Sequence, residues 1–168
     1  MITSAIKRLA WALTLLALQV LILDQVHPWG YGAPLVCSLI VITLPTGTSR
    51  CTALLWGFGT GLIADIFAGT AGISSAALTL VALIQPPLLE LMAPRDSEEE
   101  LQPSFSTMGR WKHLHFIALL LMVHHLVYFA LESFSYFRIE DIAISLGVSY
   151  AASLLIIILI EYARNPKK

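Results

Sequence analysis

Long apolar runs separated by short polar breaks dominate this sequence of 168 residues. The hydrocarbon core of a bilayer is about 30 Å thick, so an α-helix needs roughly 20 apolar residues to cross it. Six runs reach or approach that length, and each predicts a transmembrane helix. We expect an all-α membrane protein, a single polytopic bundle (1–168) of six helices with approximate bounds 6–23, 34–46, 51–68, 74–92, 114–134 and 142–162.

The composition excludes an ordinary soluble domain. Charged residues make up 12% of the chain and hydrophobic residues 57%, whereas a soluble domain is about 25% charged. The net charge of −1 and the scattered basic residues also argue against nucleic acid, whose binding needs a basic patch. The chain is therefore expected to lie in lipid, with no nucleic-acid partner.

The second run, residues 34–46, is the weakest of the six. As a helix it would reach only about 20 Å, which is shorter than the hydrocarbon core. It would cross only if the helix starts early, tilts or lies among longer neighbours. Whether this run spans the bilayer stays open.

Lysine and arginine residues lie mainly on one side of the predicted bundle. By the positive-inside rule that side is cytoplasmic, which places both termini and the acidic loop 93–113 in the cytoplasm and requires an even number of spans. Glu90 and Glu161 lie near this inner surface, where we expect them to reach water. The basic residues on the inner side are Lys7, Arg8, Arg50, Arg95, Arg110, Lys112, Arg164, Lys167 and Lys168, and Arg138 lies on the other side.

The third run carries glycine at every second position from Gly57 to Gly61. Residues four apart share a helix face, so Gly57, Gly61 and Asp65 form a stripe. Small residues let membrane helices approach closely, which favours packing against another helix or a partner protein; simple tolerance of glycine is the alternative. Gly59 points to the other side and predicts a second neighbour and a central helix. Gly72 follows in the next turn.

Asp65 is the second unusual residue of this run, because burial of a carboxylate in lipid is energetically costly. One interpretation is that it snorkels to water at the outer interface. The other is that it accepts hydrogen bonds from a further helix or a partner, since the carbonyl end of its own helix repels an anion. His27, Arg138 and the amides of the turn 68–72 lie on the correct side.

Two adjacent prolines interrupt the fourth run. Pro86 and Pro87 remove two backbone donors and predict a bend in helix 74–92. The bend is either a functional hinge or, more simply, a static feature.

Two adjacent histidines mark the middle of the fifth run. His124 and His125 point about 100° apart on a helix, so they do not form the same-face pair of a zinc site. His125, Tyr128 and Glu132 share one stripe. A proton relay or a metal site along that stripe is one interpretation. The simpler one is that neutral imidazoles bond to facing helices and hold them together.

Motifs of catalysis are missing from the sequence. It contains no nucleophile elbow, phosphate-binding loop, HExxH or CxxC arrangement. We therefore expect no enzyme, no catalytic residues, no metal and no cofactor.

The order of the segments resembles the family of rod shape-determining membrane proteins MreD, in the form typical of Bacteroidota. The resemblance covers about residues 18–162. Within it, Gly57, Gly61 and Asp65 match the motif, whereas Gln85 stands where similar sequences often carry a basic residue before proline. The resemblance rests on the segments LQVLILDQVHPWGYGAPLVCSLIVITLPTGTSR, GFGTGLIADIFAGTAGISSAA, LELMAPRD, MVHHLVYFALESFSYF and IIILIEY.

The resemblance implies a function and a fold. It implies a non-enzymatic inner-membrane protein of the cell-elongation complex, which maintains cell shape by binding MreC and linking MreB filaments to peptidoglycan synthesis by RodA and penicillin-binding protein 2 (PBP2). It also implies a fold similar to the substrate-binding (S) subunits of energy-coupling-factor transporters, but no small-molecule substrate is expected. The glycines and Asp65 carry over only as packing or partner positions.

Two other functions remain open. The polar residues Asp65, His124, His125 and Glu132 would suit a small-molecule-binding membrane subunit of a transporter if they converged on one cavity. An intramembrane metal enzyme that uses the two histidines is the third hypothesis.

Overall fold

Helices are the regular structure of the chain in the part that the structure describes. This computed structural model describes residues 2–26, 32–70, 72–93, 102–133 and 139–164, and these ranges contain no strand. Of these helices, α1, α3, α4, α6 and α7 are long and apolar enough to cross a membrane. The elements are α1 (Ile2–Leu21), a 3-10 turn η1 (Leu23–Gln25), α2 (Ser38–Ile42), α3 (Arg50–Ala68), α4 (Ile73–Met92), α5 (Phe105–Met108), α6 (Arg110–Ser133) and α7 (Ile139–Arg164).

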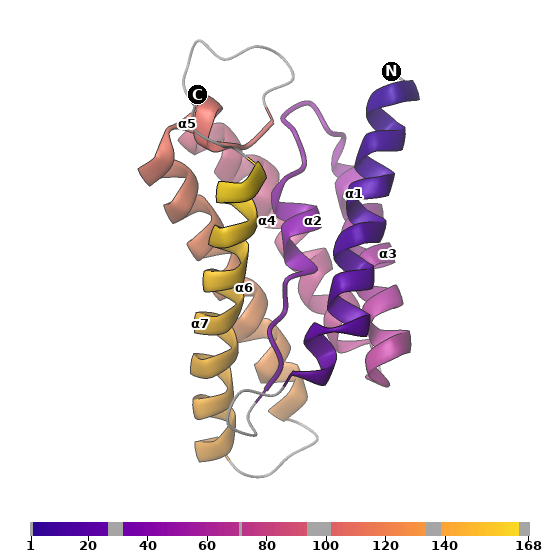
Figure 1. Cartoon of the computed structure of the whole chain (residues 1–168), viewed down its shortest axis with the longest axis vertical. Coiled ribbons are helices and arrows are strands. Elements are labelled where there is room, and N and C mark those ends of the chain that lie inside the picture. The colour runs from indigo at the N-terminus through magenta and orange to yellow at the C-terminus, as the bar shows by residue number, and fades with distance from the viewer. Residues whose placement is uncertain (1, 27–31, 71, 94–101, 134–138, 165–168) are drawn as a thin grey trace.

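Successive crossings of the bundle alternate in direction, and α1 begins at the same end at which α7 ends (Figure 1). The helices α3 and α6 also begin at this end. We call it the basic end, because the basic residues within the described ranges all lie there on these helix termini. They are Lys7, Arg8, Arg50, Arg110, Lys112 and Arg164.

Residues 32–46 return the chain to the basic end without a long helix. The helix expected over residues 34–46 is present only as α2, five residues that rise about 8 Å. Residues 32–36 have no regular structure. Pro34 has no N–H and disfavours a helical conformation of the residue before it, so an apolar run alone does not make this segment helical. All five residues of α2 are buried, in the centre of the bundle.

The pair α3 and α4 forms a tight antiparallel hairpin. Ser49 caps the start of α3 by accepting a hydrogen bond from the Thr52 N–H, at 3.2 Å. Gly69 ends α3 in the left-handed conformation at φ +68°, and Gly72 precedes α4 at φ +83°. Because both glycines occupy a region that side chains disfavour, the chain reverses within a few residues.

The helix α4 continues without interruption through Pro86 and Pro87. The bend expected at these prolines stays a prediction. The residue before them, Gln85, is buried, and its amide donates to the Ile42 and Leu44 carbonyls at 3.4 and 2.9 Å. Gln85 therefore satisfies carbonyls at the end of the short helix α2.

The connection expected over residues 93–113 is shorter than the sequence indicates. The helix α6 already begins at Arg110, and α5 occupies Phe105–Met108. Ser104 and Thr107 form a capping box at α5. This helix was not predicted, because serine and threonine are also typical of a loop.

Large apolar side chains cover the outside of the bundle. Exposed examples include Phe58 on α3, Leu83 on α4, Leu126 on α6 and Leu155 on α7. In water such a surface would drive aggregation, whereas in a bilayer it meets acyl chains. The apolar exterior and the five long apolar helices therefore both indicate a protein that lies in a membrane.

Candidate functional site

Asp65 is fully engaged within its own chain. Its carboxylate accepts hydrogen bonds from the Ser74 N–H at 2.8 Å, the Ser75 N–H at 2.9 Å, the Ser75 hydroxyl at 2.8 Å and the Thr70 hydroxyl at 2.5 Å. The side chain is 2% exposed, so it does not snorkel to water. His27 and Arg138, the other donors considered from the sequence, lie outside the described residues.

The geometry makes Asp65 the N-terminal cap of the next helix. The preceding residue of α4, Gly72, has no side chain with which to cap it. The carboxylate of α3 bonds instead to free N–H groups in the first turn of α4, where the helix dipole favours an anion. A charge that is unfavourable at the end of its own helix is thus stabilised by the start of its neighbour.

Gly57 and Gly61 bring α3 into backbone contact with α4. A Cβ on Gly57 would lie 2.7 Å from the Leu78 carbonyl oxygen, and one on Gly61 would lie 2.6 Å from the Ser75 nitrogen. Nothing lies within 4 Å of such an atom on Gly59. In the described part of the chain, the second neighbour predicted from Gly59 is therefore not found at that position, although α3 also contacts α1 and α2.

A second polar network holds the extended segment inside the bundle. The buried Gln19 carbonyl accepts from the Val36 N–H at 2.7 Å, and the Gln19 amide donates to the Pro34 carbonyl at 2.8 Å. The Ser153 hydroxyl of α7 accepts from the Leu35 N–H at 2.7 Å. Irregular backbone at membrane depth is tolerated where protein satisfies its polar groups, and here α1 and α7 do so.

His125 belongs to this network. Its Nδ1 lies 2.9 Å from the Leu121 carbonyl, and its Nε2 lies 3.1 Å from the Ser153 hydroxyl. A neutral imidazole with its proton on Nδ1 donates to Leu121 and accepts from Ser153, which leaves the Ser153 oxygen free to accept from Leu35. This arrangement agrees with the simpler interpretation of His125, a neutral imidazole that holds facing helices together, because it links α6 to α7.

His124 has no such partner. It is completely buried, and neither ring nitrogen has a hydrogen-bond partner. Its ring meets the rings of His125 and Tyr128 with centroids 5.5 and 6.3 Å apart. Hydrogen bonds do not join His125, Tyr128 and Glu132 in the described part of the chain, so the stripe is not a continuous relay there. The described residues also contain no group of three potential metal ligands.

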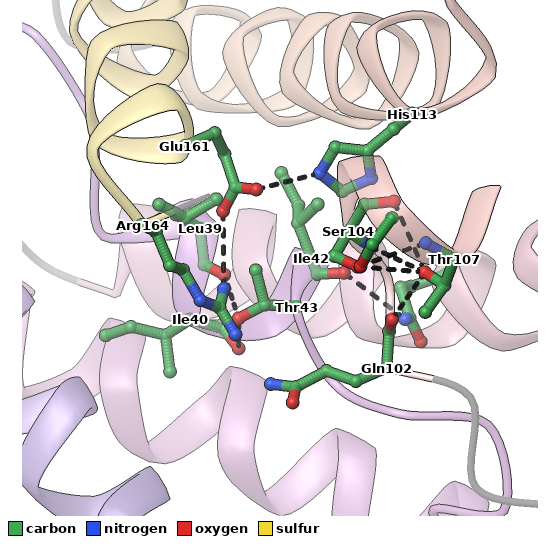
Figure 2. Close-up of polar contacts among 12 residues, drawn as sticks. Leu39, Ile40, Ile42, Thr43, Gln102, Ser104, Thr107, His113, Glu161 and Arg164 are labelled. Carbon is green, nitrogen blue, oxygen red and sulfur yellow. Dashed lines mark hydrogen bonds and ion pairs between the residues drawn. The ribbon is translucent and has the colours of Figure 1, made fainter. Parts of the chain in front are cut away.

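A third polar cluster lies at the basic end and was not anticipated. The Nε2 of His113 on α6 lies 3.0 Å from Glu161 Oε2 on α7, and both side chains are 0% exposed (Figure 2). Arg164 Nη1 lies 3.3 Å from the other oxygen of Glu161. The expectation that Glu161 reaches water is wrong, because its side chain is fully buried beside His113 of α6, whereas Glu90 is exposed.

An open groove of about 490 Å³ runs along the outer side of the α3–α4 hairpin. Its lining is mostly apolar and includes Leu54 and Phe58 of α3 and Thr79 and Leu83 of α4. The glycine stripe does not line it, except for Gly72 at the turn. Any partner helix at this hairpin would therefore meet leucine and phenylalanine rather than Gly57 or Gly61.

Comparisons with protein-family models, curated proteins and solved structures found no match to this chain. Fold and composition still define its class. A helical chain with five apolar helices of spanning length, an apolar exterior and internally satisfied polar groups is a multi-pass membrane protein.

Proposed function

We propose that this protein is a non-enzymatic component of the bacterial cell-elongation complex, of the MreD type, that binds MreC and so links MreB filaments to peptidoglycan synthesis by RodA and PBP2. In this proposal the chain crosses the inner membrane six times, with residues 32–46 as the irregular crossing. Both termini and the basic end are cytoplasmic, and the fold is similar to that of transporter S subunits. The residue pattern described above motivates each of these statements.

One observation carries the proposal. The close contact between α3 and α4 depends on the motif residues that carry the resemblance. Gly57 and Gly61 let the two backbones approach, and Asp65 caps the start of α4. Such a contact builds a stiff hairpin whose opposite face is free. That face carries Leu55 and Phe58, which are 70% and 51% exposed, as a scaffold for a partner's membrane helix requires.

Photo-crosslinking in living cells tests this proposal. The reactive residue replaces Phe58 on the free face of α3, and in a matched control it replaces Leu155, which is 60% exposed on α7. We expect MreC to be captured from position 58 and rod-shaped cells to become round when the protein is depleted. Normal rods after depletion, together with no MreC captured from either position, would contradict the proposal.

The buried, unpartnered His124 favours one alternative, a small-molecule-binding membrane subunit of a transporter. A buried polar group without a partner is costly and is often the place of an unseen ligand. Native mass spectrometry of the purified protein in detergent separates the two functions. A retained small molecule that is lost in His124→Leu would support the transporter subunit, and its absence would favour the scaffold.

A further inference from the structure

A short segment at the basic end forms a self-contained unit, which we call the cap (residues 102–108). Its hydrogen bonds are internal. The Ser104 hydroxyl accepts from the Thr107 N–H at 3.3 Å, the Thr107 hydroxyl bonds the Ser104 N–H at 3.0 Å and the Gln102 carbonyl at 2.8 Å, and the Met108 N–H reaches the Ser104 carbonyl at 3.1 Å. The cap can therefore move as a unit without breaking a hydrogen bond to the rest of the described chain.

Within the described ranges, side-chain packing holds the cap on the bundle. The Phe105 ring meets the His113 ring edge-on, with centroids 5.2 Å apart, and the Tyr162 ring at 5.1 Å. Two further residues of the cap, Pro103 and Met108, are also buried. Contacts of this kind are weak compared with the packing of a core, so local opening is easier than opening of the core.

Gly109 joins the cap to α6 and is built as a hinge. Its backbone lies at φ +78° and ψ 152°, a conformation available essentially only to glycine. A Cβ placed there would find nothing within 4 Å. The joint therefore carries no side chain of its own, and the space beside its Cα is open.

The cap covers groups that gain from contact with water. Figure 2 shows Ser104 and Thr107 beside His113, with Glu161 pointing toward His113 from α7. The Nδ1 of His113 is buried without a partner, and the ring is paired only through Nε2, to a fully buried carboxylate. Burial of such a pair carries a desolvation penalty that hydration would relieve. The desolvation penalty of His113 and Glu161 therefore opposes closure of the cap.

We propose that the cap opens and closes about Gly109 over the buried His113–Glu161 pair. In the open state, a carboxylate and an imidazole between α6 and α7 face the aqueous phase at the basic end. In the closed state, Phe105 seals them. The segment is thus a conformational switch at the end of the bundle, and its operation does not depend on which partner the protein binds.

Cysteine labelling measures the opening. A cysteine replaces the buried Met108 in the full-length protein in nanodiscs, with the exposed Cys51 changed to serine and Cys37, 1% exposed, retained. The rate of reaction with a membrane-impermeant maleimide reports how often the cap is open. We expect Phe105→Ala to raise this rate at least tenfold. The matched control Leu155→Ala, on the exposed face of α7, should leave it unchanged.

A second variant tests the cause of opening. The double change His113→Phe with Glu161→Leu removes the buried polar pair, and we expect it to slow labelling at Met108→Cys about tenfold. A cysteine at the exposed Ser106 should react at one rate in all variants. The proposal is overturned if Phe105→Ala leaves the rate unchanged, or if labelling follows unfolding of the whole protein, as monitored by circular dichroism. An equal or faster rate in a folded double variant also overturns it.

Discussion

Alanine at Gly61 is expected to push α3 and α4 apart, whereas alanine at Gly59 is not. The new Cβ at position 61 would lie 2.6 Å from the Ser75 nitrogen and closer still to the Ser75 Cα. Ordinary contact starts at 3.4 Å, so the backbones must separate by at least about 0.8 Å. Overpacking of this kind costs about 1–3 kcal/mol. The movement also stretches the hydrogen bond from the Ser75 N–H to Asp65, which is 2.9 Å long and contributes about 1–3 kcal/mol when its acceptor is a charged group.

The same substitution has an opposite effect on the helix itself. Replacement of glycine by alanine favours a helix interior by up to about 1 kcal/mol at either position. The net expectation is that Gly61→Ala lowers the free energy of unfolding by about 2–4 kcal/mol, while Gly59→Ala leaves it unchanged or raises it by up to about 1 kcal/mol.

Reversible unfolding in mixed detergent micelles, followed by far-ultraviolet circular dichroism, measures both variants under one condition. The difference between them removes the shared effect of helix propensity. Equal stabilities would refute the reasoning, because they would mean that the backbone contact between the two helices is absent in solution.

Three further substitutions give expected outcomes in the same assay. Asp65→Asn turns an NH₂ group toward donors that now face a carboxylate, so we expect a loss of about 2–4 kcal/mol, and an unchanged stability would contradict the capping role. Gln19→Leu leaves the Val36 N–H and Pro34 carbonyl without partners and should cost about 2–4 kcal/mol, with faster hydrogen exchange across residues 34–37 as the second readout. His124→Leu should preserve or increase stability, since it removes unpartnered nitrogens, whereas His125→Leu should decrease it; the reverse order would show that His124 has a partner.

The contact of α3 with α4 could be read from the sequence because local rules determine it. Glycines four apart and a carboxylate near a glycine turn lie within one hairpin, and the donors to Asp65 come from residues 70–75. The sequence named the amides of the turn 68–72 as possible donors, whereas the amides that bond to Asp65 are those of Ser74 and Ser75, just after this turn. It did not show that Gly59 lacks a neighbour, because periodicity gives the direction of a residue but not what occupies the space beyond it.

Long-range polar contacts could not be predicted. Leu35 bonds to a residue 118 positions away, and His113 to one 48 positions away. Neither Ser153 nor Glu161 differs in its local sequence from a residue that faces water or lipid. The irregular backbone before α2, where a helix was expected, could not be predicted for a related reason. Hydropathy indicates whether a segment is buried, but not whether its backbone bonds to itself or to Gln19.

The bond between Leu35 and Ser153 also sets an order of assembly. During synthesis, Gln19 is already present when the extended segment is made, but Ser153 follows only after four more long helices have begun. Until then, the Leu35 N–H lacks its protein acceptor, so the extended segment reaches its final state last although it is made early. A chain shortened before α7 should thus be recognised by membrane proteases as incomplete, even with its first four long helices in place.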